Sequence, residues 1–214
     1  MSKWIKHPLE LEDDTVKLIP LKKQHRDGLL AAASDGNLWE LWYTSVPSEA
    51  TIDTYIATAL DQKEKGEEYP FTVIDAQSGK IIGCTRFYGM QPQHKRLEIG
   101  YTWYAKSVQR TGVNTACKRL LLGYAFEQLE CIAVQIVTDW FNLRSRAAIA
   151  RLGAKQDGVL RNHRINADGS YRDTVVFSIT NSEWHGVKKN LEYKMQTYKA
   201  SLCCLLYTSD AADE

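Results

Sequence analysis

The sequence predicts a single domain of the α/β class, and three observations carry this prediction. The chain has 214 residues, a length that suits one well-packed domain and is short for two. Hydrophobic residues make up 44% of it and charged residues 25%, as in an ordinary globular protein. Segments with strand patterning and segments with helix patterning follow one another along the chain, without an internal repeat or a low-complexity stretch.

The first third of the chain reads as one strand and two helices. Residues 15–21 begin with alternating polar and apolar side chains and predict a strand, and residues 23–34 predict a short helix. A loop follows over residues 35–50, where Gly, Asn and Pro break the regular patterns. A second helix is expected over residues 51–65, with Gly66 ending it.

The middle of the chain predicts a run of strands over residues 69–75, 81–88 and 97–104. The first two flank a short turn, in which Gly79 takes the left-handed position. The remaining elements are a helix over 114–129, a strand over 134–138, a helix over 143–152 that Gly153 ends, strands over 159–166 and 173–180, and a last helix capped by Ser182.

Charge and hydropathy exclude several classes of protein. The 27 Lys and Arg residues nearly cancel the 26 Asp and Glu residues, which leaves a formal net charge of +1. Domains that bind nucleic acid usually carry a strongly basic face. No apolar run approaches the roughly 18 residues of a membrane span, and the N-terminus lacks the apolar core of a secretory signal. We therefore expect a cytoplasmic protein with neither nucleic acid nor a membrane as partner.

The cysteines predict neither a metal site nor a disulfide framework. No two of the five form a CxxC pair, and no His stands at metal-ligand spacing from them. Cys117 and Cys131 fall within apolar patterns, so they are expected as buried free thiols.

A candidate anion site lies between the strand 97–104 and the helix 114–129. Residues 109–115 (QRTGVNT) hold Gly112 in a turn before the helix, where backbone N–H groups and the helix dipole favour an anion such as phosphate. Lys106, Arg110, Lys118 and Arg119 stand near the turn in sequence, and no Asp or Glu occurs over residues 105–126. The segment matches neither a P-loop nor a dinucleotide fingerprint. An ordinary turn beside a solvated basic helix face is the alternative.

A second candidate element opens the helix 143–152. Asn142 is placed to cap that helix. Ser145 shares a helical face with Ile149 and Leu152, so its hydroxyl is expected at the inward edge of the first turn, where it needs a hydrogen-bond partner.

Taken together, these residues resemble the GNAT acetyltransferase superfamily and, within it, the RimJ/RimL-like branch. The resemblance covers about residues 15–184, and its most specific stretches are 98–103 (EIGYTW), 109–115, 142–154 and 172–177 (RDTVVF). It implies one GNAT-like domain with a mixed central sheet of about six to seven strands, flanked by helices on both faces. Two residues depart from the usual family pattern, namely Asn114 in the phosphate loop and Lys106, where many relatives have proline.

The resemblance also implies acetyl-coenzyme A as acetyl donor, without a metal. The pyrophosphate would lie on the loop, and the pantetheine arm would run between the strands 98–104 and 134–138. Ser145 would donate a proton to the departing thiolate, and Glu98 is the candidate general base for direct attack by the amine. The implied cofactor contacts are Thr102, Trp103, Gln109, Arg110, Thr111, Gly112, Val113, Asn114, Thr115, Asn142 and Ser145.

We therefore expect an N-acetyltransferase that acts on a primary amine, either a protein N-terminal α-amine or a small-molecule amine. A catalytically silent module that binds acyl-coenzyme A is the alternative. Three aromatic residues of the loop 35–50, Trp39, Trp42 and Tyr43, are candidates for the wall of the acceptor pocket, and covering the core explains them equally well. The oligomeric state is open between a monomer and a homodimer.

The end of the chain stands apart from the domain. Residues 204–214 (CLLYTSDAADE) resemble the translation of a transposase adapter used in preparing sequencing libraries. The alternative is a native acidic tail. We expect residues 1–200 to form the acetyltransferase domain and residues 201–214 to be non-native.

Overall fold

A single eight-stranded sheet organises the computed structural model, which describes the backbone of residues 4–166 and 168–209 and side chains through Tyr198. The strand order is β1-β2-β3-β4-β5-β6-β8-β7. Of the pairs between neighbouring strands, β5–β6 is parallel and the other six are antiparallel. The strands are β1 (Leu11–Glu12), β2 (Val16–Pro20), β3 (Tyr69–Asp75), β4 (Ile81–Gln91), β5 (Arg96–Tyr104), β6 (Ala133–Asp139), β7 (Lys155–Ile165) and β8 (Tyr171–Thr180).

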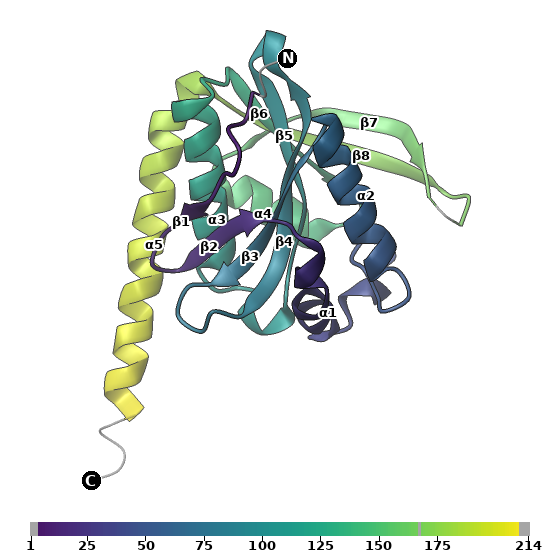
Figure 1. Ribbon diagram of the computed structural model, residues 1–214. Helices are drawn as coiled ribbons and strands as arrows, with labels where there is room; N and C mark the ends of the chain where they lie inside the picture. The colour runs from purple at the N-terminus through teal and green to yellow at the C-terminus, as the bar shows by residue number, and fades with distance from the viewer. Residues whose placement is uncertain (1–3, 167, 210–214) are drawn as a thin grey trace.

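Helices cover both faces of the sheet (Figure 1). One face packs against α1 (Arg26–Ser34) and α2 (Ile52–Lys65), with Leu29, Ile52 and Trp103 in the shared core. The other face packs against α3 (Val113–Gly123) and α4 (Leu143–Leu152), and α5 (Asn181–Ser209) runs alongside α3. The single mixed-sheet α/β domain predicted from the sequence is therefore confirmed.

Local sequence explains where several elements end. Gly66 ends α2 with φ +77°, and Gly153 ends α4 with φ +104°. Both values lie in the left-handed region that favours glycine at helix C-termini. Gly79 has φ +68° in the turn between β3 and β4, as predicted.

Several details differ from the sequence prediction, and four of them affect the extent of an element or its cap. The two-residue strand β1 brings the sheet to eight strands and is too short to show alternation. The helix predicted over 114–129 stops as an α-helix at Gly123 and continues as a π-helix over Tyr124–Gln128. The strand predicted over 159–166 begins earlier, at Lys155. Ser182 does not cap α5, because the Glu183 carboxylate accepts a hydrogen bond of 3.0 Å from the Thr180 N–H and the helix begins at Asn181.

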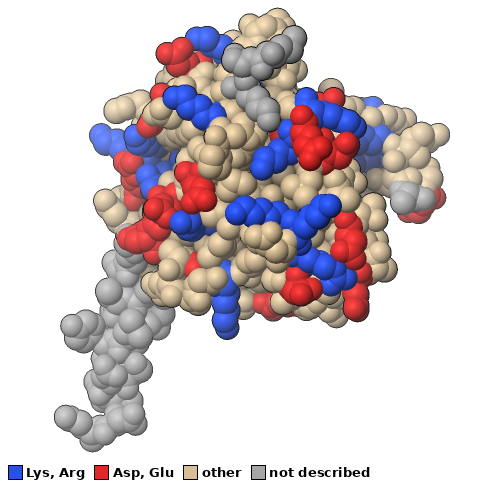
Figure 2. Space-filling model, in the orientation of Figure 1, with Lys and Arg blue, Asp and Glu red and all other residues tan. Residues whose placement is uncertain are grey.

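The thiols of Cys84, Cys117 and Cys131 are free and buried, in agreement with the prediction for the last two. Across the part of the chain that the structure describes, none of the helices combines the length and hydropathy needed to cross a membrane. Figure 2 shows Lys and Arg interspersed with Asp and Glu over the face that it draws, in keeping with the near-zero formal charge.

Candidate active site

The central sheet parts between β5 and β6. These two parallel strands pair from Arg96–Ala133 to Glu98–Gln135. Beyond that point β5 stays paired with β4, and β6 stays paired with β8. The carboxyl ends of two adjacent parallel strands therefore diverge, and in α/β sheets such ends are the usual place for ligands.

A β-bulge interrupts β5 just after this point. Gly100 pairs with Arg86 and Trp103 pairs with Cys84, so Tyr101 and Thr102 together face Thr85 alone. Tyr101 has φ +49°, in the left-handed region. Because a bulge disrupts the hydrogen-bond ladder locally, it leaves backbone groups of β5 available to a ligand.

The loop that follows β5 is held by its own side chains. The side-chain amide of Gln109 donates to the Tyr104 carbonyl oxygen at 2.9 Å, and the Thr111 hydroxyl donates to the Val108 carbonyl oxygen at 2.6 Å. Arg110 turns the backbone with φ +65°. The loop leads into α3, whose first N–H groups lack partners within the helix. Residues 109–115 thus form the strand–turn–helix geometry predicted for an anion site.

Two of the four basic residues predicted around this loop are engaged elsewhere. The Arg119 guanidinium pairs with Asp13 at 3.2 Å. Lys118 is only 4% exposed, and its ammonium donates to the Thr102 hydroxyl at 2.7 Å. The sequence prediction was wrong for these two because position along α3 sets the direction of a side chain, and theirs point to the sheet and to the N-terminal segment.

Asn142 and Ser145 open α4 as predicted. The Asn142 side-chain oxygen accepts a hydrogen bond of 3.0 Å from the Ser145 backbone N–H and so caps the helix. Asp139 shapes the preceding turn, since its carboxylate accepts a hydrogen bond from the Phe141 N–H at 2.8 Å. Ser145 is half-buried, and its hydroxyl makes no hydrogen bond within the described part of the chain.

Glu98 is the last residue of β5 that pairs with β6. It is half-buried and pairs with Tyr88 on β4 and Gln135 on β6. Burial and the nearby Glu98 carboxylate raise the pKa of Tyr88. Gly89, with φ +53°, leaves room for this carboxylate, because an added Cβ would lie 2.9 Å from Glu98 Oε1. The Glu98 carboxylate therefore lies beside Tyr88, in space that the missing side chain of Gly89 leaves open.

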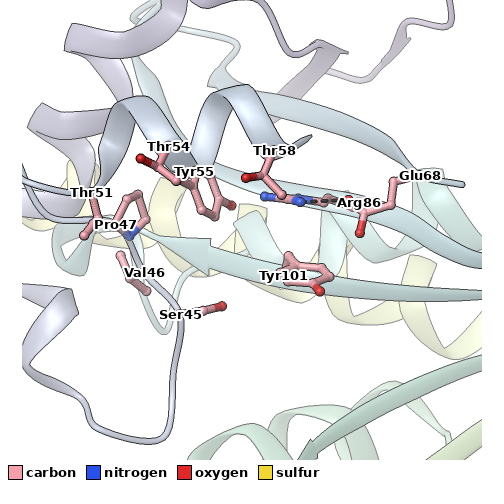
Figure 3. Close-up of a pocket in the computed structure, with 10 residues that line it drawn as sticks. All are labelled: Ser45, Val46, Pro47, Thr51, Thr54, Tyr55, Thr58, Glu68, Arg86 and Tyr101. Atoms are coloured by element: carbon pink, nitrogen blue, oxygen red, sulfur yellow. Dashed lines mark hydrogen bonds and ion pairs between the residues drawn. The ribbon is translucent and has the colours of Figure 1, made fainter. Parts of the chain in front are cut away.

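A cavity of about 500 Å³ lies between α2, the segment 45–47, β4 and β5. Figure 3 shows the Arg86 side chain between the rings of Tyr55 and Tyr101, and its guanidinium carbon lies 4.6 and 4.4 Å from the two ring centroids. Arg86 also pairs with Glu68 at 2.7 Å. The cavity is lined by Ser45, Val46, Pro47, Thr51, Thr54, Tyr55, Thr58, Glu68, Arg86 and Tyr101.

The three aromatic residues proposed for the acceptor pocket lie outside the lining of this cavity. Trp39 packs against the core between α1 and α2. Trp42 is 61% exposed and contacts the rings of Tyr43 and Phe141. The cavity lining begins two residues after Tyr43, at Ser45.

Sequence reasoning missed Arg86, although a signal was present. Arg86 is the one charged residue in the predicted strand 81–88, between Thr85 and Phe87, and it is 3% exposed. A charged side chain in a buried strand needs a specific partner, which here is Glu68 on the segment before β3. That pairing joins residues far apart in sequence and was not visible from the strand alone.

Comparison with known proteins gives a consistent result. The family model described as "Acetyltransferase (GNAT) domain" matches residues 15–155. A Bacillus subtilis (strain 168) protein named "Putative ribosomal N-acetyltransferase YdaF" is 30% identical over 181 residues, covering 83% of this chain and 96% of the relative. This match confirms the predicted resemblance to the RimJ/RimL-like branch.

Solved structures share the fold. A GCN5-related N-acetyltransferase from Brucella melitensis is 27% identical with a TM-score of 0.76, covering 91% of this chain and 86% of that one. Mycobacterium smegmatis RimJ in complex with CoA-disulfide is 19% identical with a TM-score of 0.71, covering 87% of this chain and 93% of that one. The family match spans well over half of the sequence, and the chain therefore belongs to the GNAT family of N-acetyltransferases.

Proposed function

We propose that this N-acetyltransferase transfers the acetyl group of acetyl-coenzyme A to a primary amine, and that the amine is the N-terminal α-amine of a protein. The observation that carries the proposal is the conjunction at the end of β5 of a bulge, a fixed loop and the N-terminus of α3. Acetyl-coenzyme A carries a thioester at one end, phosphates at the other and a polar arm between them. The thioester and the arm would lie along the bulge of β5, and the phosphates would lie on the loop and the N-terminus of α3.

The phosphate end would bind to the backbone N–H groups of residues 110–115. The loop residues would present these groups in a fixed conformation because Gln109 and Thr111 tie the loop to Tyr104 and Val108. The positive end of the α3 dipole adds to the attraction for an anion. Coenzyme A as the ligand agrees with two solved structures of the same fold, RimJ and RimL, which are complexes with disulfide forms of coenzyme A.

The polar arm would bind along β5 and the start of α4. Thr102 lies in the bulge and Trp103 directly follows it, and both lie beyond the last residue of β5 that pairs with β6. Their backbone groups would hydrogen-bond to the arm and orient the acetyl carbonyl. Asn142 would contact the arm near its thiol end, where it already fixes the first turn of α4.

Proton transfer would fall to Glu98 and Ser145. An amine attacks only after its ammonium form loses a proton, and Glu98 would accept that proton directly or through water. The attack forms a C–N bond and breaks the C–S bond of the thioester. Ser145, whose hydroxyl has no partner in the described structure, would donate a proton to the sulfur.

The name of the Bacillus subtilis relative supports a protein as acceptor. The cavity of about 500 Å³ beside Tyr101 adjoins the bulge of β5 and has the volume to hold the first residues of a polypeptide. Small-molecule amines are the competing class, and the two are separated by testing them side by side.

A thermal-shift titration with acetyl-coenzyme A tests the donor. A ligand that binds the folded state stabilises it by mass action, so the melting temperature should rise with ligand concentration. Desulfo-coenzyme A, which retains the phosphates, should also stabilise the protein, whereas acetate should not. Absence of any shift at saturating acetyl-coenzyme A would contradict the proposal.

A further inference from the structure

Three polar side chains from three elements meet at the bulge of β5. Lys118 on α3 is 4% exposed, and its Nζ donates a hydrogen bond to Thr102 Oγ1 at 2.7 Å. The Thr102 hydroxyl lies 2.8 Å from the hydroxyl of Thr85, which is fully buried on β4. Thr102 and Thr85 are the residues that face each other across the bulge.

Lys118 carries its charge without a carboxylate partner. In the described residues no Asp or Glu pairs with it, and Asp13, the acidic group near this part of α3, pairs with Arg119. Cys117 on α3 is the titratable group that interacts with Lys118, and Tyr104 on β5 interacts in turn with Cys117. Both groups are neutral near pH 7, because burial raises the pKa of each. Burial lowers the pKa of Lys118 to about 8, so its ammonium is still mostly protonated at neutral pH.

Stability does not explain this arrangement. Taking an ammonium out of water is unfavourable, and replacing a buried charge with an apolar side chain of similar volume is often neutral or stabilising. Packing alone would therefore favour a residue such as Met at this position. A buried charge with no acidic partner that contacts a candidate ligand-binding segment points to a role in the reaction.

We propose that Lys118 is a positioning residue for acetyl transfer, which anchors the Thr102 side chain and thereby the bulge of β5, and places positive charge behind its backbone groups. The proposal rests on the proposed function, in which the Thr102 and Trp103 peptides orient the acetyl carbonyl. Negative charge develops on that carbonyl oxygen during attack, and a fixed positive environment stabilises it more than it stabilises the ground state.

Steady-state kinetics of the full chain with Lys118→Met tests the proposal. We expect kcat to fall at least about tenfold, while the Kd for acetyl-coenzyme A changes less than about threefold and the melting temperature stays equal or rises. The exposed Lys189→Met variant is the control for removing one lysine and should match the wild type in all three measurements.

A second pair of variants isolates the hydrogen bond. Thr102→Val removes the hydroxyl that accepts from Lys118, and Thr102→Ser keeps it. Thr102→Val should lower kcat as Lys118→Met does, the double variant should be no slower than the slower single variant, and Thr102→Ser should retain most of the activity. Non-additivity of this kind marks two residues that act as one unit.

Amide NMR gives a readout that needs no acceptor. In the wild type, the Thr102 and Trp103 amide signals should differ between the acetyl-coenzyme A and coenzyme A complexes, and Lys118→Met should abolish that difference. Three results with Lys118→Met would each overturn the inference. One is an unchanged kcat, and another is an unchanged difference in amide signals between the two complexes. The third is a lowered melting temperature together with weakened cofactor binding. Failure of the wild type to bind acetyl-coenzyme A would instead overturn the proposed function.

Discussion

Glu68 and Arg86 form a buried ion pair at the wall of the cavity beside β5. Their side chains are 12% and 4% exposed, and the carboxylate lies 2.7 Å from the guanidinium. The rings of Tyr55 and Tyr101 hold the guanidinium on its two sides. The pair therefore fixes one end of the candidate acceptor pocket.

Removing the carboxylate should destabilise the protein. Glu68→Gln leaves the guanidinium of Arg86 buried without its counter-charge, which costs about 3 kcal/mol or more. Urea unfolding measures this loss as a lower midpoint at an unchanged slope. Glu130→Gln is the matched control, because the side chains of the pair Lys95–Glu130 are 51% and 74% exposed, and a solvent-exposed ion pair contributes little to stability. Equal changes in the free energy of unfolding for the two variants would contradict a larger contribution from the buried pair.

The buried ammonium of Lys118 predicts a particular pH dependence of stability. Its pKa is about 8 in the folded chain, because of burial, against an ordinary 10.5. Below pH 8 both states hold the proton, and the full cost of burying the charge is present. Between pH 8 and 10.5 the unfolded state binds more protons than the folded state, so this residue's contribution to stability rises with pH.

The comparison is made between the wild type and Lys118→Met by denaturant unfolding at several pH values. The variant should be the more stable protein at neutral pH, and its advantage should shrink by roughly 3 kcal/mol as the pH rises through this window. A difference in stability that does not change between pH 7 and pH 10 would contradict the assignment of a buried charge.

The cap of α4 should affect both stability and cofactor affinity. Asn142→Ala removes the oxygen that accepts from the Ser145 N–H and should destabilise the protein by about 1 kcal/mol. Because the same turn carries the proposed contact to the pantetheine arm, the Kd for acetyl-coenzyme A should also increase. Asn142→Asp keeps the cap and should restore stability. A Kd unaffected by Asn142→Ala, measured by calorimetry, would remove this contact from the account.

Much of this site follows from local sequence. The loop 109–115 and the Asn142 cap depend on residues within a few positions of one another, so the pattern in the chain predicts their geometry. The burial and the contacts of Lys118 and Arg86 do not follow from local sequence. Each is a charged residue whose burial is set by partners on other strands and helices, Thr102 for one and Glu68 and Tyr55 for the other. Such contacts depend on how the sheet and helices pack, which sequence periodicity does not encode.

The proposed acid and base should separate binding from chemistry. Ser145→Ala and Glu98→Gln each remove one proton-transfer group while leaving the phosphate loop intact, so kcat should fall by about 10²-fold or more. The Kd for acetyl-coenzyme A should stay within about threefold of the wild-type value. Unchanged turnover in both variants would remove these two roles.

The most direct test of the central claim is thiol release from acetyl-coenzyme A, followed with peptides that carry a free N-terminus. The account predicts release that depends on the peptide, stops when its N-terminal amine is blocked, and deposits one acetyl group on that amine as seen by mass spectrometry. Tight binding of acetyl-coenzyme A without release in the presence of any peptide or small amine would contradict it and favour a silent binding module.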